Sequence, residues 1–172
     1  MKRIYLLTIL ICLLFCFSVK AQRRKTVFVE FLGNGLAISG NFELRLKDNS
    51  NSGSGVRAGI GGTTVSGTDN NGNFVNVGIV TFPLGYNYLI GEKRSSFEIG
   101  AGITPILVSG NGFINSETFS GSGITLTGVL NAGYRYQPLN NGFFGKLTWT
   151  PTATNTGFYP RFFGLSLGYS FK

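Results

Sequence analysis

The sequence predicts an all-β fold: a transmembrane antiparallel up-and-down β-barrel of about eight strands. In residues 161–172, large apolar side chains alternate with Gly and Ser. Alternation with a period of two indicates an extended strand with one bulky face and one small, polar face. Charged residues make up only 13% of the chain, against about 25% in a typical soluble domain. Bulky apolar residues outside and small polar ones inside suit a narrow barrel in lipid.

The first 21 residues have the features of a secretory signal peptide. Lys2 and Arg3 precede an almost unbroken apolar run over residues 4–17, and Val19-Lys20-Ala21 resembles a cleavage site. The run is shorter than the about 20 apolar residues that a membrane-spanning helix needs, so an uncleaved anchor is the less favoured alternative. We therefore expect a signal peptide at residues 1–21 and one barrel domain at residues 22–172.

The first half of the mature chain divides into four expected strands. They are residues 27–31, 36–47, 55–65 and 74–90. Between the first two, Asn34-Gly35 suits a tight hairpin because both positions tolerate positive φ. In the fourth strand the alternation slips, so we expect a bulge or bend near Val80, Thr81 and Pro83, where proline cannot donate to a ladder.

The second half contains four more expected strands, and the connections differ in length. The strands are residues 97–108, 124–137, 143–151 and 161–172. The long connections are residues 66–73, 109–123 and 152–160, and the short turns are residues 48–54, 91–95 and 138–142. In a barrel with both termini in the periplasm, long loops lie outside and tight turns inside. The Asn34-Gly35 hairpin is the exception, because it is short and lies at the long-loop end.

Aromatic residues gather near the expected strand ends. Near the short turns these are Phe42, Tyr86, Tyr88, Phe97, Tyr134, Tyr136, Phe143, Tyr169 and Phe171. Near the long loops these are Phe31, Phe74, Trp149, Tyr159 and Phe163. Two aromatic girdles at the membrane interfaces are typical of transmembrane barrels.

With the signal peptide, the eight amphipathic strands and the terminal Gly168-Tyr-Ser-Phe-Lys172, the chain resembles the small eight-stranded outer-membrane β-barrel proteins of the OmpA/OmpX type. The resemblance covers the whole mature chain as a pattern and not as a specific motif. It implies a location in the bacterial outer membrane, with membrane lipid and the barrel-insertion machinery as partners. Members of this class usually end on an aromatic residue. Here Lys172 follows Phe171, which bears on assembly efficiency more than on location.

The composition excludes several kinds of catalytic site. The chain contains no His, so His-dependent triads and His–metal sites are excluded. Cys12 and Cys16 both lie in the expected signal peptide, so the mature chain has no thiol chemistry. Residues 69–73 superficially resemble a calcium loop, but their spacing departs from that of an EF-hand. The sequence therefore predicts no enzymatic activity, cofactor or metal site, and no basic, aromatic-interleaved patch that would indicate a nucleic-acid partner.

Seven charged residues fall at strand positions expected to face the lumen. They are Glu30, Glu43, Arg45, Arg57, Glu98, Arg135 and Lys146. An unpaired charge out of water is costly, whereas paired and hydrogen-bonded charges are tolerated. Because eight strands leave an interior just wide enough for side chains, we expect an ion-pair network in the periplasmic half of the lumen. This network would act as a structural plug or, alternatively, as a gated ion path.

The basic cluster of the mature chain, Arg23-Arg24-Lys25, lies at its beginning. We expect a solvated tail there, and contact with anionic lipid headgroups is the alternative.

The leading functional hypothesis is a non-enzymatic outer-membrane barrel with a side-chain-plugged lumen and a structural or surface-interaction role. Loops carry function more often than their scaffold does, so an extracellular partner would bind residues 109–123 and 152–160. The apolar residues in these loops, which would contact a partner or pack together, are Phe113, Ile114, Phe119, Phe158 and Tyr159.

Two alternatives remain at the level of sequence. A small pore or conduit for hydrophobic molecules would need a lumen free of the charge network. A soluble secreted β-barrel that binds an apolar ligand would need bulky residues inside and Gly and Ser outside.

Overall fold

A computed structural model describes residues 23–48, 50–68, 72–91, 93–114 and 117–172, so the expected signal peptide lies outside the described residues. The strands are β1 (Lys25–Leu32), β2 (Ile38–Arg45), β3 (Gly53–Thr68), β4 (Phe74–Thr81), β5 (Leu84–Ile90), β6 (Ser95–Ile114), β7 (Glu117–Tyr136), β8 (Gly142–Trp149), β9 (Thr152–Thr154), β10 (Gly157–Tyr159) and β11 (Phe163–Phe171). A short 3-10 helix, η1 (Gly33–Gly35), joins β1 to β2. Among the described residues, no helix is long and apolar enough to cross a membrane.

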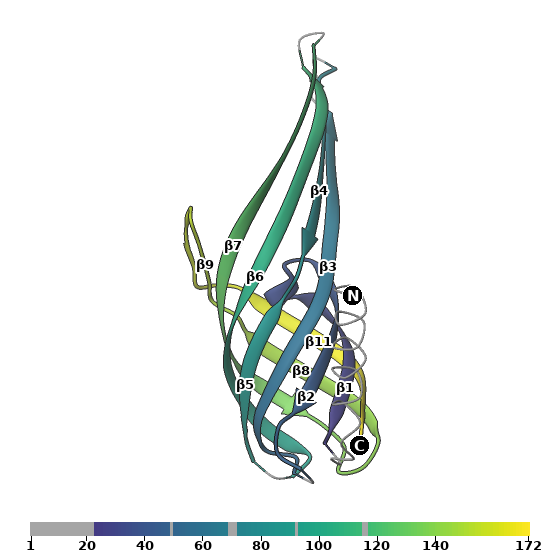
Figure 1. Cartoon of the computed structure of the whole chain (residues 1–172), viewed down its shortest axis with the longest axis vertical. Helices are drawn as coiled ribbons and strands as arrows, with labels where there is room; N and C mark the ends of the chain where they lie inside the picture. The colour runs from purple at the N-terminus through teal and green to yellow at the C-terminus, as the bar shows by residue number, and fades with distance from the viewer. Residues whose placement is uncertain (1–22, 49, 69–71, 92, 115–116) are drawn as a thin grey trace, which may run out of the picture.

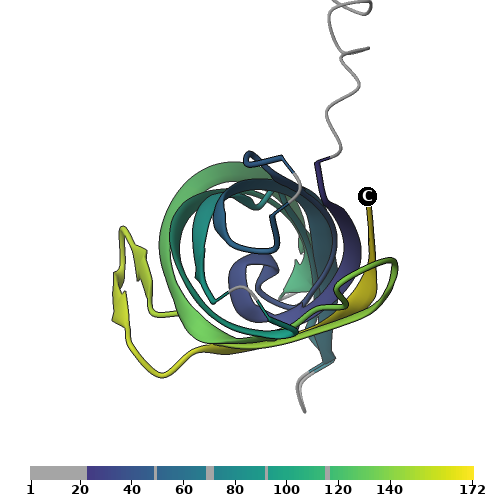
Figure 2. The ribbon, with the colours of Figure 1, turned by 90° about the horizontal axis from the view of Figure 1, so that it is seen from below.

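The strands close into an antiparallel ring, which confirms the predicted all-β barrel (Figure 1). Strand β1 pairs with β2 on one side and with β11 on the other, from Lys25 opposite Phe171 to Leu32 opposite Gly164. Both β4 and β5 lie between β3 and β6, so they are two parts of one strand and the described ring has eight members. The break falls at Phe82 and Pro83, where the sequence predicts a bend. Figure 2, which looks along the barrel, shows the closed ring.

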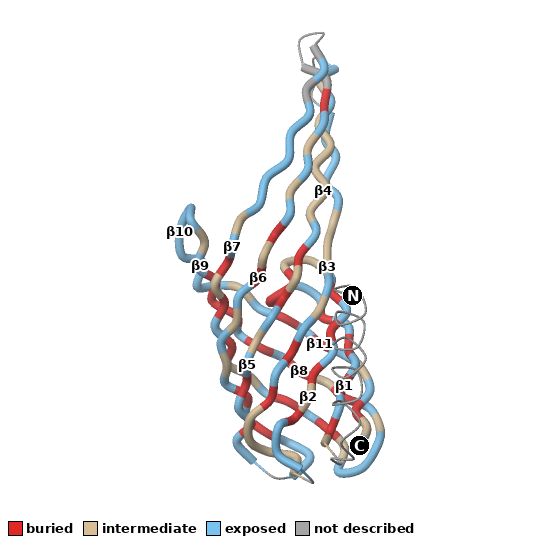
Figure 3. Tube along the Cα trace, viewed as in Figure 1, coloured by how far each residue is buried: buried red, intermediate tan, exposed pale blue. Residues whose placement is uncertain are grey.

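Burial follows the alternation along each strand (Figure 3). The side chains of Leu165, Leu167, Leu126 and Ile99 are 42% to 57% exposed on the outside of the ring, whereas Ser166 is fully buried. A water-soluble barrel would place these residues in the opposite way, so the soluble secreted alternative is wrong. The outside of the ring is apolar and the inside is polar, as in a barrel that faces lipid.

The height of the apolar exterior matches a bilayer. On β7 the outward apolar positions run from Ile124 to Tyr136, and all the large side chains among them are exposed. At about 3.3 Å per residue and a tilt of about 45°, this span rises about 28 Å. We call this exterior band the apolar belt. Its upper edge is a row of cross-strand neighbours: Val80, Leu107 and Ile124.

Inward glycines allow the aromatic Phe28 to pack inside this narrow ring. Gly168 on β11 lies opposite Phe28 on β1, and a Cβ added to Gly168 would lie 2.6 Å from the Phe28 Cβ. We expect Gly168→Ala to lower the free energy of unfolding by about 1–3 kcal/mol, because overpacking must displace the strand or the ring. Urea unfolding in lipid vesicles measures the change. Gly40→Ala on β2 is the matched control, since a Cβ there meets nothing within 4 Å, and an equal loss in both variants would contradict the packing argument.

Two of the predicted long loops are instead continuations of strands. Residues 109–114 belong to β6 and residues 117–123 to β7, and the two strands pair continuously from Ser95 opposite Tyr136 to Ile114 opposite Glu117. Strand β3 likewise continues to Thr68. The sequence hides these extensions because above the apolar belt neither face meets lipid, so the bulky-and-small alternation of the belt is lost. The third predicted loop, residues 152–160, contains the β9–β10 hairpin.

The first connection is not a two-residue hairpin, because β1 ends at Leu32 and β2 begins at Ile38. Instead η1 is folded inward, and Gly33, Asn34 and Gly35 are all buried. The flanking residues Leu32 and Leu36 have positive φ values of 58° and 70°. The conformation is unusual for leucine, so it has to be held by contacts inside the barrel.

Candidate functional site

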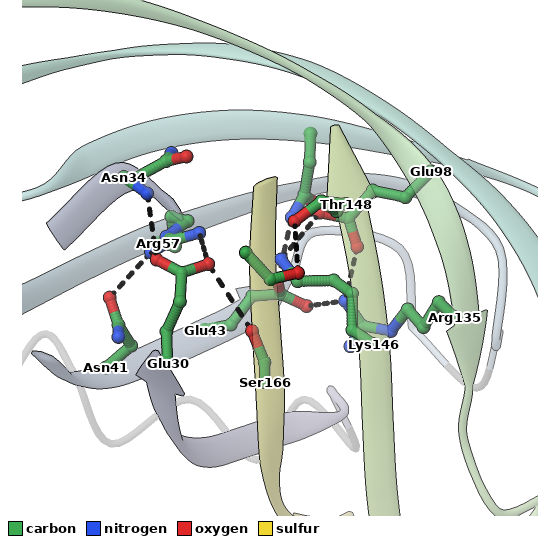
Figure 4. A network of polar contacts seen from close by, with 12 residues as sticks. Glu30, Asn34, Asn41, Glu43, Arg57, Glu98, Arg135, Lys146, Thr148 and Ser166 are labelled. Atoms are coloured by element: carbon green, nitrogen blue, oxygen red, sulfur yellow. Dashed lines mark hydrogen bonds and ion pairs between the residues drawn. The ribbon is translucent and has the colours of Figure 1, made fainter. Parts of the chain in front are cut away.

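One group of polar side chains lies directly beneath η1 at the outer end of the lumen (Figure 4). Glu30 Oε2 forms an ion pair with Arg57 Nη2 at 2.7 Å and accepts a hydrogen bond from the Asn34 N–H at 3.2 Å. Arg57 also donates to Asn41 Oδ1 at 2.8 Å, and Ser166 donates to Glu30 Oε1 at 3.3 Å. We call this set the outer cluster. It joins four strands to the inward-folded connection.

The underside of η1 is held by two further hydrogen bonds from the barrel wall. Thr81 Oγ1 donates to the carbonyl of Gly35 at 3.0 Å, and Thr104 Oγ1 donates to the carbonyl of Asn34 at 2.9 Å. Gly164 on β11 lies so close that an added Cβ would sit 2.8 Å from the Gly33 Cα. The connection is therefore anchored on several sides, which accounts for its strained flanking leucines.

A second group of charges lies deeper in the lumen, toward the short turns (Figure 4). Glu43 Oε1 pairs with Arg45 Nη2 at 2.8 Å and with Arg135 Nη1 at 2.7 Å. Arg135 Nη1 also pairs with Glu98 Oε2 at 3.0 Å, and Lys146 Nζ pairs with Glu98 Oε1 at 2.9 Å. We call these five side chains the inner cluster. None is more than 1% exposed.

Asn87 extends the inner cluster at its centre. Its side-chain N–H donates to Glu43 Oε2 at 2.7 Å and to Glu98 Oε1 at 3.3 Å, while its oxygen accepts from Arg45. The amide therefore bonds to both carboxylates and to one guanidinium. A buried ion pair is tolerated only when such hydrogen bonds satisfy its remaining polar atoms.

Two aromatic rings separate the outer cluster from the inner cluster. Phe28 and Phe144 are buried, with ring centroids 5.2 Å apart. Arg57 lies 5.4 Å and Lys146 5.3 Å from the Phe28 centroid, and Arg135 lies 4.5 Å from the Phe144 centroid. The rings contribute cation–π contacts to both clusters. The sequence analysis identified neither Phe28 nor Phe144 as part of the lumen, although Phe28 lies two residues before the inward Glu30 on β1.

All seven lumen charges expected from the sequence lie in these two clusters, but not at one height. Glu30 and Arg57 lie at the outer end, beneath η1, and not in the periplasmic half. The reason is that Glu30 accepts a hydrogen bond from the inward-folded connection, which the sequence presents as an ordinary hairpin.

The short-turn end of the lumen is bridged by two residues that the sequence analysis missed. Arg24 donates to the carbonyls of Leu139 at 2.6 Å and Asn140 at 3.0 Å, and to Ser170 Oγ at 3.1 Å. Gln137 donates to the carbonyl of Asn51 at 2.6 Å. Arg24 is 1% exposed, so it is not part of a solvated tail. Alternation places Arg24 on the same face of the chain as the buried Thr26, two residues later, so its inward orientation could have been predicted from the sequence.

Above the apolar belt, strands β3, β4, β6 and β7 continue as an open four-stranded sheet, here called the extension (Figure 1). Its inner face continues the lumen wall, and its outer face continues the lipid-facing wall. On the inner face lie Val65, Val75, Val77, Ile79 and Val108. On the outer face lie Thr64, Ser66, Asn76, Ser109, Asn111, Ser120 and Ser122. The polarity of the barrel wall is therefore reversed in the rows next to the apolar belt, and one row further out Phe74, 41% exposed, returns an aromatic side chain to the outer face.

The expected loop contacts are divided between the extension and the β9–β10 hairpin. Phe158 and Tyr159 lie on β10 and are 61% and 52% exposed. Phe113 and Ile114 belong to β6 and Phe119 to β7, and their side chains lie outside the described residues. Within the part of the chain that is described, no group of three or more Cys, His, Asp or Glu side chains is placed to hold a metal ion.

The solved structures that the chain is compared with below are outer-membrane proteins. The chain is similar to the N-terminal β-barrel domain of OprF from Pseudomonas aeruginosa, with 17% identity, 87% of this chain and 96% of that chain covered, and a TM-score of 0.56. It is also similar to a major outer membrane protein from Thermus thermophilus, with 13% identity, coverage of 87% and 98%, and a TM-score of 0.54. No protein-family model matches the sequence, and no curated protein matches it. The chain therefore has the fold of the small outer-membrane β-barrels, and its apolar belt agrees with that fold.

Proposed function

We propose that this protein is a non-conducting, non-enzymatic barrel of the bacterial outer membrane that presents a β-sheet for contacts outside the cell. The observation that carries the proposal is the extension with its reversed polarity. A scaffold that only spanned the membrane would end near the apolar belt, as β1, β2, β8 and β11 do. On β6, the seven residues after Leu107 add about 23 Å of strand.

A sealed lumen is supported by the contacts at both of its ends. The inner-cluster side chains fill the lower half, Arg24 and Gln137 bridge the periplasmic opening, and η1 lies across the outer opening. A conduit for hydrophobic molecules would have to pass the buried charges of both clusters. An apolar solute would find no favourable environment beside them.

We expect purified full-length protein to show no stable open state in planar bilayers. If the ion pairs and η1 seal the lumen as proposed, single-channel recordings should stay at the baseline of protein-free membranes. The same recording is made with the Arg24→Ala variant, which lacks the side chain that bridges the periplasmic opening, to test whether this bridge contributes to the seal. Steady conductance of the wild-type protein would contradict the sealed lumen.

The inner face of the extension supports a role in surface contacts. Val65 is 59% exposed, and Val77 lies directly opposite it on β4. An exposed apolar surface is characteristic of interaction sites, and here it lies beyond the membrane. The edges of β3 after Gly62 and of β7 before Gly128 are also unpaired among the described residues.

The surface role is tested with bacteria that display the protein, measured by their retention on immobilised extracellular polypeptides. The double variant Val65→Asn/Val77→Asn makes the inner face polar and is expected to lower retention at least fivefold. Ser66→Asn adds the same side chain to the outer face and serves as the control. Equal retention by the wild type and both variants would contradict a contact role for the inner face.

A further inference from the structure

The outer face of the extension contains a polar hollow just above the apolar belt. It has a volume of about 520 Å³ and is lined by Thr64, Asn76, Gly78, Ser109, Gly110, Asn111, Ser120, Gly121 and Ser122. The outward side chains come from two adjoining cross-strand rows of β3, β4, β6 and β7. None of these lining residues is charged, and most carry hydroxyl or amide groups that both donate and accept hydrogen bonds.

A second, mainly apolar hollow adjoins the first on the membrane side. It has a volume of about 670 Å³ and is lined by Val80, Leu107, Val108, Ser109, Ser122, Gly123 and Ile124. Ser109 and Ser122 line both hollows, so the two are continuous along the outer face. The apolar part includes the upper edge of the apolar belt, and the polar part lies beyond it.

This order of surfaces matches an amphiphile that stands in the outer leaflet. Its acyl chain would lie against Val80, Leu107 and Ile124 in the hydrocarbon layer, and its headgroup would lie against the polar hollow. Because no cation lines the headgroup region, nothing there would compensate a phosphate. Neutral hydroxyls, in contrast, find donors and acceptors at regular strand spacings of about 4.8 Å.

We propose that this continuous surface binds a membrane lipid with a neutral saccharide headgroup, a glycolipid of the surrounding outer leaflet. Ser109 and Asn76 contact the headgroup, and Leu107 contacts the acyl chain. The site is on the face opposite to Val65 and Val77, so it is independent of the contacts proposed for the inner face. Failure of one proposal leaves the other intact.

The test measures lipid retention on the full-length protein in nanodiscs by native mass spectrometry. The probes are a neutral diglycosyl diacylglycerol, phosphatidylglycerol with the same acyl chains, and the free disaccharide. We expect the glycolipid to be retained at least tenfold more strongly than phosphatidylglycerol, and the free disaccharide not to be retained. Equal retention of both lipids would show that only the acyl chain is recognised and would overturn the proposal. Retention of the free disaccharide as strong as that of the glycolipid would overturn the membrane source.

Two variants locate the site. Ser109→Phe fills the junction of the two hollows and should reduce glycolipid retention at least tenfold. Thr68→Phe places the same ring on the same face of β3 but one row beyond the hollow, opposite Phe74, so its retention should equal that of the wild type. Asn76→Val, which suits a strand and removes the amide, gives an independent measurement if Ser109→Phe folds poorly. Wild-type retention in both Ser109→Phe and Asn76→Val would overturn the proposal.

Discussion

The Glu98→Gln variant is expected to lose about 3–5 kcal/mol of the free energy of unfolding, because it leaves the buried Lys146 without a carboxylate partner and Arg135 with Glu43 alone. Glu98 pairs with Arg135 at 3.0 Å and with Lys146 at 2.9 Å, and both partners are fully buried. A glutamine of the same shape keeps the packing but cannot balance the two charges. Urea unfolding of the protein refolded into lipid vesicles, followed by the heat-modifiable shift on gels, measures the loss.

Two further variants separate charge balance from packing. Adding Lys146→Met to Glu98→Gln removes one cation together with the carboxylate, and should recover most of the lost stability. Asp48→Asn breaks an exposed pair with Arg23, in which the Arg23 and Asp48 side chains are 39% and 55% exposed, and should change stability by less than about 1 kcal/mol. A Glu98→Gln loss as small as that of Asp48→Asn would show that the inner cluster is hydrated and not sealed.

The architecture of the barrel could be predicted because lipid imposes a pattern on the sequence. Wherever one face of a strand meets hydrocarbon and the other a narrow lumen, bulky apolar residues alternate with Gly, Ser, Thr and charged residues. Leu165 and Ser166 on β11 are one such pair, and their exposed and buried positions follow from the alternation alone. The direction of burial and the number of strands in the ring were predictable for this reason.

The extension and η1 could not be predicted because neither lies against the hydrocarbon layer, which imposes the alternation elsewhere. In residues 109–114 and 117–123 both faces of the strands lie outside the hydrocarbon layer. Ser, Gly and Asn are equally suited to a strand or a loop there, so the backbone pairing of β6 with β4 and β7 determines that these residues form strands. At η1 the Asn34-Gly35 pair suits a hairpin locally. Tertiary contacts with Glu30, Thr81 and Thr104 override that preference. Local sequence reasoning cannot detect partners as distant as Asn34 and Thr104.

The two faces of the extension, taken together, explain why its polarity is reversed. In the two proposals made above, the outer face offers hydrogen-bonding groups to lipid headgroups, whereas the inner face is directed away from them. Apolar residues there, such as Val65 and Val77, are consequently available for a partner without being covered by lipid. The two proposed contacts are compatible, because they use opposite faces of the same strands.

Leu130→Arg is expected to lower the free energy of unfolding by about 2–4 kcal/mol, because it places a charge near the middle of the apolar belt. Leu130 is 57% exposed on the outside of β7, midway between Ile124 and Tyr136. In water such an exposed leucine would tolerate arginine with little effect, so a large loss reports directly on lipid at this position. The folded fraction in vesicles over a urea titration measures the change.

Leu139→Arg is the matched control for the belt. Leu139 is 46% exposed and lies in the turn between β7 and β8, so an arginine there stays in water or at the interface and should cost about 0–1 kcal/mol. Because the two sites share the residue type, the substitution and similar exposure, the difference between the variants isolates the effect of depth in the bilayer. Equal stability of Leu130→Arg and Leu139→Arg would mean that the apolar belt does not face hydrocarbon, and the membrane-spanning assignment would fail with it.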